Sequence, residues 1–427
     1  MRTRIRSTTA ARCYARLPLA DSVYWTSFAD SAIRCAPLAG GGYVDTLYEL
    51  AQGEPALGPR GVAIYSAAGR MYWANQGDNT IQGAPLAGGI VDKLYGPAQV
   101  VSLPGGVAVD PAAGRIYWAN ESDNTIRAAP LASGGTADAV YGPANGVSSP
   151  GAVAIDPAAG RIYWTNGDNT IRGAKLAGGG IVDILYRPAD GVSGPSGVAI
   201  DPAAGRIYWA NVLDNTIRGA PLDGRGTADI LYGPADGVSG PAGVAIDPTD
   251  RIISIIHQSR RSALARWFSP EGRVINWLTN HGWLGRYPPG RIYWTNHNDN
   301  TIRGASLAGG GIVDILYSGS GRGVSWPQFL AVLRAPLGIG VPTISGGGSL
   351  GQLLRCSRGT WAAELLGSFL YRAPQSFRYQ WALDGSDIGG ATLTAYTPTT
   401  RGSYTCRVTA TNQAGSTAQT SAAVAVS

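Results

Sequence analysis

The pair Tyr-Trp returns along this chain at a nearly fixed interval, and no other feature constrains the fold as strongly. The pairs begin at Tyr24, Tyr72, Tyr117, Tyr163, Tyr208 and Tyr293. Their spacings are 48, 45, 46 and 45 residues, followed by one of 85 residues that is nearly two periods. A unit copied at this interval buries its apolar face only against its neighbours, so the spacing predicts a repeat architecture.

Each copy contains four short apolar runs. In the copy that begins at Gly197 they are GVAID, RIYWAN, NTIRGAPL and ADILY, and turn-forming residues separate them. Four strands in a period of this length are typical of a β-propeller blade, which is a four-stranded antiparallel sheet. Gly205 is expected to take a left-handed conformation in the first turn, and the pair Asp214-Asn215 predicts a hairpin between the second and third strands.

Composition agrees with an all-β chain and excludes several classes of function. The 427 residues include 61 Gly and 27 Pro, and only 15% are charged, which suits strands joined by tight turns. The net charge of +6 is spread through the repeats, so no nucleic-acid partner is expected. We find no apolar run long enough for a membrane span. The first residues are basic but lack the apolar region of a signal peptide, so the chain itself does not reveal export.

The repeat resembles a known family. Tyr-Trp-(Thr/Ala)-Asn, an Ile-Arg strand and a Leu-x-Gly-Gly turn are similar to the YWTD repeat of low-density lipoprotein receptor class B propellers over residues 23–336, with residues 1–22 unassigned. This resemblance implies a six-bladed ring. The family motif ends in Asp, whose carboxylate packs between blades, whereas this chain has Asn at residues Asn75, Asn120, Asn166, Asn211 and Asn296.

A damaged copy leaves the number of blades open at six or seven. Residues 250–287 lose the composition of the repeat abruptly, although GVAID at Gly243 introduces them as it introduces other copies. We interpret this stretch as a degenerate or frame-shifted blade, with an authentic functional insertion as the alternative. The first copy lacks a GVAID strand, and GVSWPQFLAVL after the last copy is expected to supply it and close the ring.

Residues 337–427 have a different pattern. Cys356, Trp381 and Cys406 are spaced 25 and 25 residues apart, and Tyr404 lies two residues before the last of them. The segment resembles an immunoglobulin-like β-sandwich with a lengthened loop near GTWAAELLGSFLYRAPQ. The resemblance implies a Cys356–Cys406 disulfide beside Trp381 and a tyrosine corner at Tyr404. The alternative is two buried thiols. Whether Cys13 and Cys35 pair stays open.

The sequence offers few candidates for chemistry. Acidic residues recur in every copy, which indicates a role in the scaffold, and no Cys or His cluster has metal-ligand spacing, so we expect no catalytic residue, metal or cofactor. Calcium binding at residues 120–123 is disfavoured because the spaced acidic ligands are missing. His257 and His281 lie in the damaged copy, and His297 follows the last Tyr-Trp pair.

Five arginines are the candidate binding residues. They follow the Ile of the third strand and could form a basic ring for an acidic polymer or a carboxylate-rich partner, although pairing with neighbouring Asp is the simpler expectation. They are Arg34, Arg127, Arg172, Arg218 and Arg303. The second copy has Gln82 at this position.

Together these features predict a non-enzymatic interaction protein. The expected product is a monomer that is secreted or displayed at the cell surface, because a disulfide implies an oxidising compartment. Its partner would be a protein or an acidic polymer. The alternatives are a propeller enzyme of the lyase or lactonase type and a structural surface component.

Overall fold

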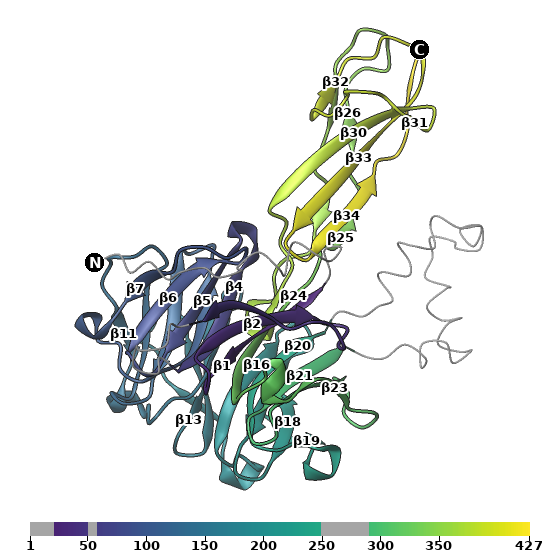
Figure 1. Cartoon of the computed structure of the whole chain (residues 1–427). Coiled ribbons are helices and arrows are strands. Elements are labelled where there is room, and N and C mark those ends of the chain that lie inside the picture. Colours follow the sequence, from purple (N-terminus) through teal and green to yellow (C-terminus); the bar gives the residue numbers. More distant parts are fainter. Residues whose placement is uncertain (1–20, 50–57, 249–289) are drawn as a thin grey trace.

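The computed structural model describes residues 21–49, 58–248 and 290–427. Within these ranges the chain is all-β, with short 3₁₀ turns and no α-helix, and no helix there could cross a membrane. Figure 1 shows a ring of sheets from which the C-terminal strands project as an elongated unit.

The ring consists of antiparallel sheets, each with four strands from the repeat. The first and innermost strands are β4 (Pro59–Tyr65), β8 (Pro104–Asp110), β12 (Val153–Asp156), β16 (Pro195–Asp201), β20 (Pro241–Asp247) and β24 (Pro327–Leu333). The second strands carry Tyr-Trp and are β5 (Arg70–Asn75), β9 (Arg115–Asn120), β13 (Arg161–Asn166), β17 (Arg206–Asn211), β21 (Arg291–Asn296) and β1 (Ser22–Ser27).

The third and fourth strands complete each sheet toward the rim. The third strands are β6 (Thr80–Pro85), β10 (Thr125–Pro130), β14 (Thr170–Lys175), β18 (Thr216–Pro221), β22 (Thr301–Ser306) and β2 (Ala32–Pro37). The fourth strands are β7 (Asp92–Tyr95), β11 (Asp138–Tyr141), β15 (Asp183–Tyr186), β19 (Asp229–Tyr232), β23 (Asp314–Ser318) and β3 (Asp45–Glu49). In the copy that begins at Gly197, the four strands therefore lie where the sequence predicts them. Gly205 and Asn215 have the expected left-handed φ values of +61° and +54°.

The predicted closing strand is present. β24, from the segment after the last copy, pairs with β1 and so supplies the first strand of the first blade. The inner strands contact one another in the order β4, β8, β12, β16, β20, β24 and back to β4. β20 pairs directly with β21, so the first strand of the damaged copy and the second strand of the last copy share one sheet. The stretch 250–287 itself lies outside the described residues.

The Tyr-Trp repeat holds neighbouring blades together through the Trp. The Trp of each second strand stacks on a Tyr from the fourth strand of the preceding blade, with ring centroids 5.3–5.8 Å apart. The hydroxyl of Tyr186 also donates to the backbone oxygen of Pro221, 2.6 Å away in the next blade. Tyr317 closes the ring, because it stacks on Trp25 and donates to the backbone oxygen of Pro37. Stacked aromatic pairs of this kind contribute about 0.5–1.5 kcal/mol each beyond the area they bury.

The C-terminal strands form two facing sheets with their own core. One sheet contains β26 (Ile344–Ser345), β27 (Leu354–Cys356) and β32 (Ala395–Tyr396). The other contains β30 (Ser376–Leu383), β31 (Ser386–Asp387), β33 (Gly402–Asn412), β34 (Gly415–Thr420) and β35 (Val424–Val426). β25 (Gly338–Gly340) pairs with β28 (Thr360–Trp361). Trp381 is fully buried, and the Tyr404 hydroxyl donates to the Thr400 oxygen at 2.7 Å, as a tyrosine corner requires.

The two core cysteines differ from the disulfide that the resemblance implies. Cys356 and Cys406 are buried free thiols in the structure. A side-chain hydrogen bond between them lowers the pKa of Cys356 and raises that of Cys406. The thiols are therefore neighbours in the reduced state, and their oxidation stays a prediction. Cys35 is disulfide-bonded, whereas Cys13 lies outside the described residues.

Part of the lengthened loop lies on the ring instead of extending the sandwich. β29 (Leu370–Tyr371) pairs in parallel with β24, and the short turn η9 (Leu366–Ser368) contacts inner strands of four blades. The Ser368 hydroxyl donates to the Ile200 oxygen at 2.6 Å. These contacts lie where the first strands end, so this loop covers the centre of one face of the ring. We call that side the proximal face and the opposite side, with the Asp-Asn turns, the distal face.

Candidate binding face

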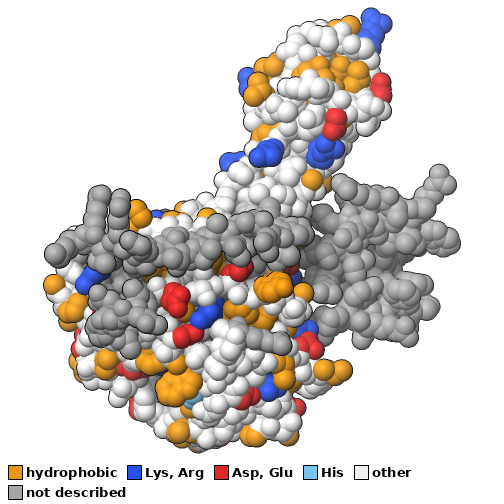
Figure 2. Space-filling view, viewed as in Figure 1, with side chains coloured by type: hydrophobic (Ala, Val, Ile, Leu, Met, Phe, Trp, Pro, Cys, Tyr) orange, Lys and Arg blue, Asp and Glu red, His pale blue; other side chains and the backbone are white. Residues whose placement is uncertain are grey.

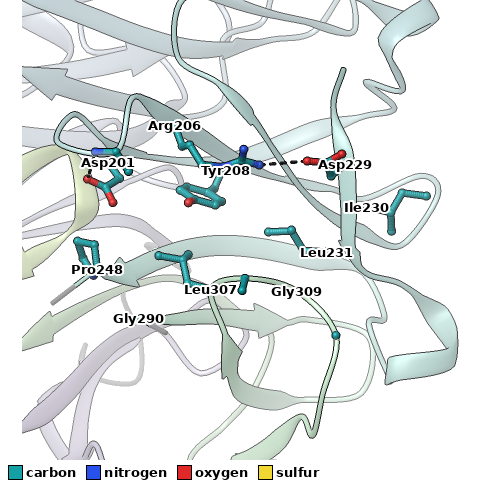
Figure 3. Close-up of a pocket in the computed structure, with 13 residues that line it drawn as sticks. Asp201, Arg206, Tyr208, Asp229, Ile230, Leu231, Pro248, Gly290, Leu307 and Gly309 are labelled. Atoms are coloured by element: carbon teal, nitrogen blue, oxygen red, sulfur yellow. Dashed lines mark hydrogen bonds and ion pairs between the residues drawn. The ribbon is translucent and has the colours of Figure 1, made fainter. Parts of the chain in front are cut away.

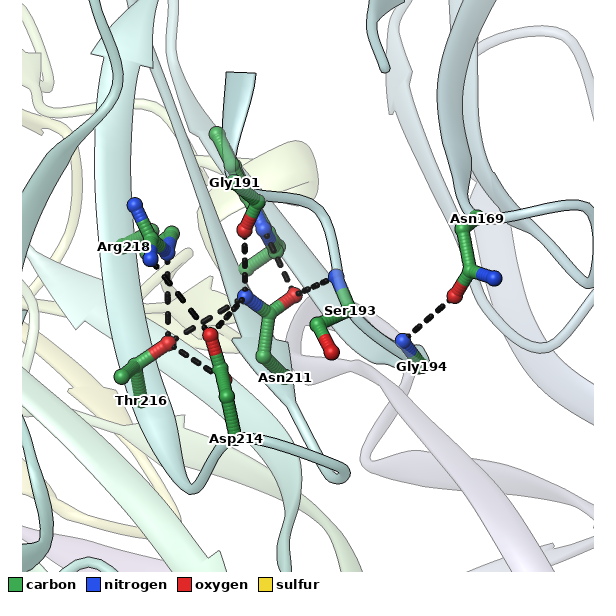
Figure 4. A network of polar contacts seen from close by, with 9 residues as sticks. Asn169, Gly191, Ser193, Gly194, Asn211, Asp214, Thr216 and Arg218 are labelled. Atoms are coloured by element: carbon green, nitrogen blue, oxygen red, sulfur yellow. Dashed lines mark hydrogen bonds and ion pairs between the residues drawn. The ribbon is translucent and has the colours of Figure 1, made fainter. Parts of the chain in front are cut away.

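A repeated polar network fixes the distal end of each blade (Figure 4). In the blade of β16 to β19, the Asn211 oxygen accepts from the Trp209 indole at 3.0 Å and from the Ser193 backbone at 3.1 Å. Its amide nitrogen donates to the Gly191 oxygen at 2.8 Å. A carboxylate could not make that last bond, because it has no hydrogen to donate. Asn in place of the family's Asp therefore anchors the connection from the preceding blade.

The arginines proposed as a binding ring belong to this network. The guanidinium of Arg218 donates to the Thr216 hydroxyl at 3.3 Å and to Asp214 at 3.4 Å (Figure 4). The same pairing with the Asp of the preceding turn holds all five candidates, whose side chains are only 10–14% exposed. The five are Arg34, Arg127, Arg172, Arg218 and Arg303. The structure thus confirms the simpler expectation of pairing with Asp and leaves no free basic ring at these positions.

Other charged side chains of the repeat are also paired. The Arg at the start of the second strand forms an ion pair with the Asp at the start of the fourth strand, as between Arg161 and Asp183 at 2.8 Å. Asp201 accepts the Ala204 backbone N–H at 3.1 Å and so caps its own turn. Figure 2 accordingly shows acidic and basic side chains interspersed over the side of the ring in view.

Residues 120–123 bind their carboxylates to arginine instead of to a metal ligand set. Asp123 pairs with Arg127 at 3.2 Å, and Glu121 pairs with Arg60 at 2.5 Å. Across the described part of the chain, no group of three or more His, Cys, Asp or Glu side chains could hold a metal ion.

Adjacent blades are joined by a further bond that the sequence does not reveal. The side chain of Asn169, in the Asp-Asn turn of one blade, accepts the backbone N–H of Gly194 in the next at 2.6 Å (Figure 4). Four other Asp-Asn turns make the equivalent bond, from Asn79, Asn124, Asn215 and Asn300. The accepting blade always offers the residue immediately before the Pro of its inner strand.

We call these residues the display positions, because their side chains are held at the distal face. Their φ values are all left-handed, between +41° and +59°. They are Gly58, Leu103, Ser149, Gly194, Gly240 and Trp326. Glycine accepts this conformation freely, whereas another residue is strained by about 1–2 kcal/mol. Leu103 and Trp326 nevertheless occupy it, and they are 40% and 53% exposed. Strain retained at exposed apolar residues indicates a functional surface.

A second ring of positions lies beside the first. The residue that follows each second strand donates its backbone N–H to a carbonyl of the display segment, as from Glu121 to Leu103 at 3.1 Å and from His297 to Gly240 at 3.0 Å. We call these the loop positions. They are Phe28, Gln76, Glu121, Gly167, Val212 and His297, and all six differ in side chain. The backbone is thus repeated while the chemistry changes from blade to blade.

The variable side chains interact across blades. Phe28 stacks on Trp326 with centroids 6.4 Å apart. Glu121 accepts from the guanidinium of Arg60 at 2.5 Å and from the amide of Gln76 at 3.0 Å, so three blades contribute to one polar cluster. The expectation that the intact blades keep their symmetry is therefore wrong at this face.

His297 is a half-buried member of the same face. Burial lowers its pKa, and the nearby positive charge of Arg60 lowers it further, against a hydrogen bond with the Gly240 backbone that raises it. The imidazole is therefore held mainly neutral near pH 7. His257 and His281 lie outside the described residues.

A separate hollow lies between the blades of β16 to β19 and β20 to β23, with a volume of about 510 Å³ (Figure 3). Its polar lining is scaffold, because Asp201 caps a turn and Arg206 is paired with Asp229. Tyr208 and Leu231 supply much of the rest. Because these residues recur in other blades, this hollow is a weaker candidate than the distal face.

Comparisons with known proteins agree with the arrangement of strands. A family model described as outer membrane protein assembly factor BamB matches residues 60–228. The crystal structure of a nidogen/laminin complex contains a chain that is 16% identical, with a TM-score of 0.53, and the match covers 73% of this chain and 97% of that one. The ring is a β-propeller.

Two further comparisons add no functional argument. A catalytically inactive virginiamycin B lyase from Staphylococcus aureus with quinupristin matches with a TM-score of 0.45 and 16% identity, over 69% of this chain and 80% of that one. No curated protein matches the chain. At these identities the likeness to solved structures concerns the propeller fold alone.

Proposed function

We propose that this chain is a non-enzymatic interaction protein whose propeller binds a protein partner through the distal face. The observation that carries the proposal is the contrast between backbone and side chains at the display and loop positions. Identical hydrogen bonds hold each position, yet the side chains differ in every blade. A scaffold role would favour the same residue throughout, whereas a surface shaped for one partner requires differences.

The chemistry of this face favours a protein over an acidic polymer. The candidate arginines are committed to Asp side chains, so a polyanion would have to displace five ion pairs. Exposed Trp326 and Leu103 instead supply apolar contact area, and Trp is enriched among the residues that dominate binding energy in protein interfaces.

The architecture that belongs to this proposal is a six-bladed, YWTD-like ring with an immunoglobulin-like domain on its proximal face. The cycle of inner-strand contacts supports six blades, and the buried Trp381 with its tyrosine corner supports the second assignment. We propose a secreted or surface location, which the disulfide-bonded Cys35 favours. The C-terminal unit projects away from the distal face, which leaves that face open to a partner.

The test compares the proteins retained by the wild-type chain with those retained by a Trp326→Gly, Leu103→Gly double variant. Glycine is the native residue at three display positions, so the backbone should tolerate both changes. We expect the partner to be lost from the double variant and kept by an Ile181→Ser control, whose side chain is 87% exposed on a rim loop. An unchanged set of retained proteins in the double variant would contradict the proposal.

One observation favours a second function, a propeller enzyme of the lyase or lactonase type. His297 is held mainly neutral on the same face as Glu121, so it could act as a general base. If this alternative holds, His297→Gln should abolish turnover of a lactone or cyclic ester while partner retention is unchanged. The binding proposal expects no such turnover.

A further inference from the structure

One blade departs from the polar network of the others. In the blade of β4 to β7, Gln82 stands where the other five have Arg, so the turn residue Asp78 lacks the guanidinium that its counterparts bind. Among the described residues no ion pair reaches Asp78, and its recorded hydrogen bond comes from the Thr80 hydroxyl at 2.7 Å. Burial raises the pKa of Asp78, whereas hydrogen bonds to its counterpart Asp168 outweigh burial and lower the pKa there.

Gln82 replaces only part of the missing guanidinium. Its amide nitrogen donates to Thr80 at 3.2 Å, just as Nε of Arg172 donates to Thr170 at 2.9 Å. Gln82 is only 9% exposed, and its Oε1 has no hydrogen-bond partner within the described ranges. An oxygen that can only accept has therefore replaced the nitrogens that donate to Asp in the other blades.

A second amide oxygen is in the same situation. Asn75 is fully buried, and its nitrogen donates to the same Thr80 hydroxyl at 3.3 Å. Its Oδ1 has no partner in the part of the chain that is described, whereas the oxygen of its counterpart Asn211 accepts two hydrogen bonds. A buried amide oxygen without a donor costs about 1–3 kcal/mol, so two of them mark a place that calls for a positive group.

These oxygens surround one point of the blade. The side chains of Asp78, Asn75 and Gln82 all contact the Thr80 hydroxyl, which brings together a carboxylate and two amide oxygens. Carboxylate, amide carbonyl and hydroxyl oxygens are the ligands of hard cations such as Ca²⁺. The nearest fixed cation is Lys93, which is the strand partner of Gln82 and whose charge acts on Asp78 from a distance.

We propose that this blade binds a hard cation, with Ca²⁺ as the test ion, through Asp78, Asn75 and Gln82. The cation takes the role that a guanidinium has in the other five blades. A single carboxylate gives a weak site, with a dissociation constant on the order of 10⁻³ M. The site is intrinsic to the blade and does not depend on the partner proposed above.

The full chain, freed of metal by a chelator, provides the test. We expect isothermal titration with CaCl₂ to detect one site and thermal unfolding to shift upward by about 2 °C at roughly ten times the dissociation constant. NaCl at equal ionic strength is the control for screening, and it should not reproduce the shift. A wild-type chain that shows no calcium-specific shift would overturn the proposal.

Two variants separate the site from general stabilisation. Gln82→Arg restores the residue of the other blades, so it should fold normally and lose the calcium response. Lys93→Met removes a competing charge and should tighten calcium binding severalfold. A calcium response that persists in Gln82→Arg would refute the assignment. So would a Lys93→Met variant that is destabilised equally with and without calcium, because Lys93 would then be the partner of Asp78.

Discussion

The strain at Trp326 can be measured by comparing two truncations of the same side chain. Trp326→Ala and Trp326→Gly both remove the stacking on Phe28, so their difference reports on the backbone at φ +45°. Glycine usually makes a chain less stable than alanine by about 0.4–1 kcal/mol, because it adds freedom to the unfolded state. A left-handed alanine costs about 1–2 kcal/mol. We therefore expect Trp326→Gly to be more stable than Trp326→Ala by about 0.5–1 kcal/mol.

Urea unfolding of the full chain, followed by fluorescence of the buried tryptophans, measures this difference. Ala158→Gly is the matched control, because Ala158 is exposed and is not among the residues with positive φ. There glycine should be the less stable residue by about 0.4–1 kcal/mol. If alanine is as stable as glycine or more stable at position 326, the display positions are not strained, and the structural argument for a functional distal face loses its main support.

Three further predictions concern the scaffold and the C-terminal unit. Gly197→Ala would place Cβ 2.4 Å from a carbonyl oxygen of the adjacent inner strand, so we expect a loss of about 2 kcal/mol or more in urea unfolding, whereas Gly233→Ala, with no atom nearby, should be neutral. Burial raises the pKa of Glu364, so its stabilisation is present at low pH and is lost as pH rises through the raised value. Glu364→Gln should therefore gain stability relative to the wild type between pH 4 and pH 7, and equal differences at both pH values would contradict this. Oxidation of Cys356 and Cys406 should stabilise the chain by about 2–4 kcal/mol, and thiols that stay reactive in denaturant after oxidation would exclude the bond.

The strands and turns of the ring could be predicted because their causes are local. Alternating apolar residues and Gly-containing turns lie within a single copy, so the four strands around Gly197 and the left-handed Gly205 follow from the sequence. The closing role of β24 also followed, because the first copy visibly lacks its inner strand.

The distal face could not be predicted in the same way, because its causes join residues in different blades. The bond from Asn169 to Gly194 spans two copies, and only that bond explains why Leu103 and Trp326 are held at positive φ. A signal was present in the sequence, since the residue after each second strand varies while its neighbours repeat. The arginine ring drew attention instead, although local pairing with Asp satisfies it.

The lengthened loop failed as a prediction for a related reason. Its length was visible, but nothing in the composition of a single-copy segment says which surface it contacts. In the structure Ser66 donates to Glu364 of this loop, and Ser66 follows the one inner strand in which Tyr65 replaces the Asp that ends most of the others. The departures from the repeat thus fall on both faces, with the proximal ones holding the C-terminal unit.

The distribution of these departures explains how a nearly identical repeat can serve a specific purpose. Stacked Tyr and Trp rings, capped Asp turns and Asn bonds between blades satisfy the ring without help from the variable positions, so substitutions there cost little stability. Trp326 and Leu103 are exceptions that cost strain and gain no burial in return, since both remain exposed. Strain without a folding benefit is best explained by a benefit on binding. The partner should therefore contact these two residues before any of the arginines.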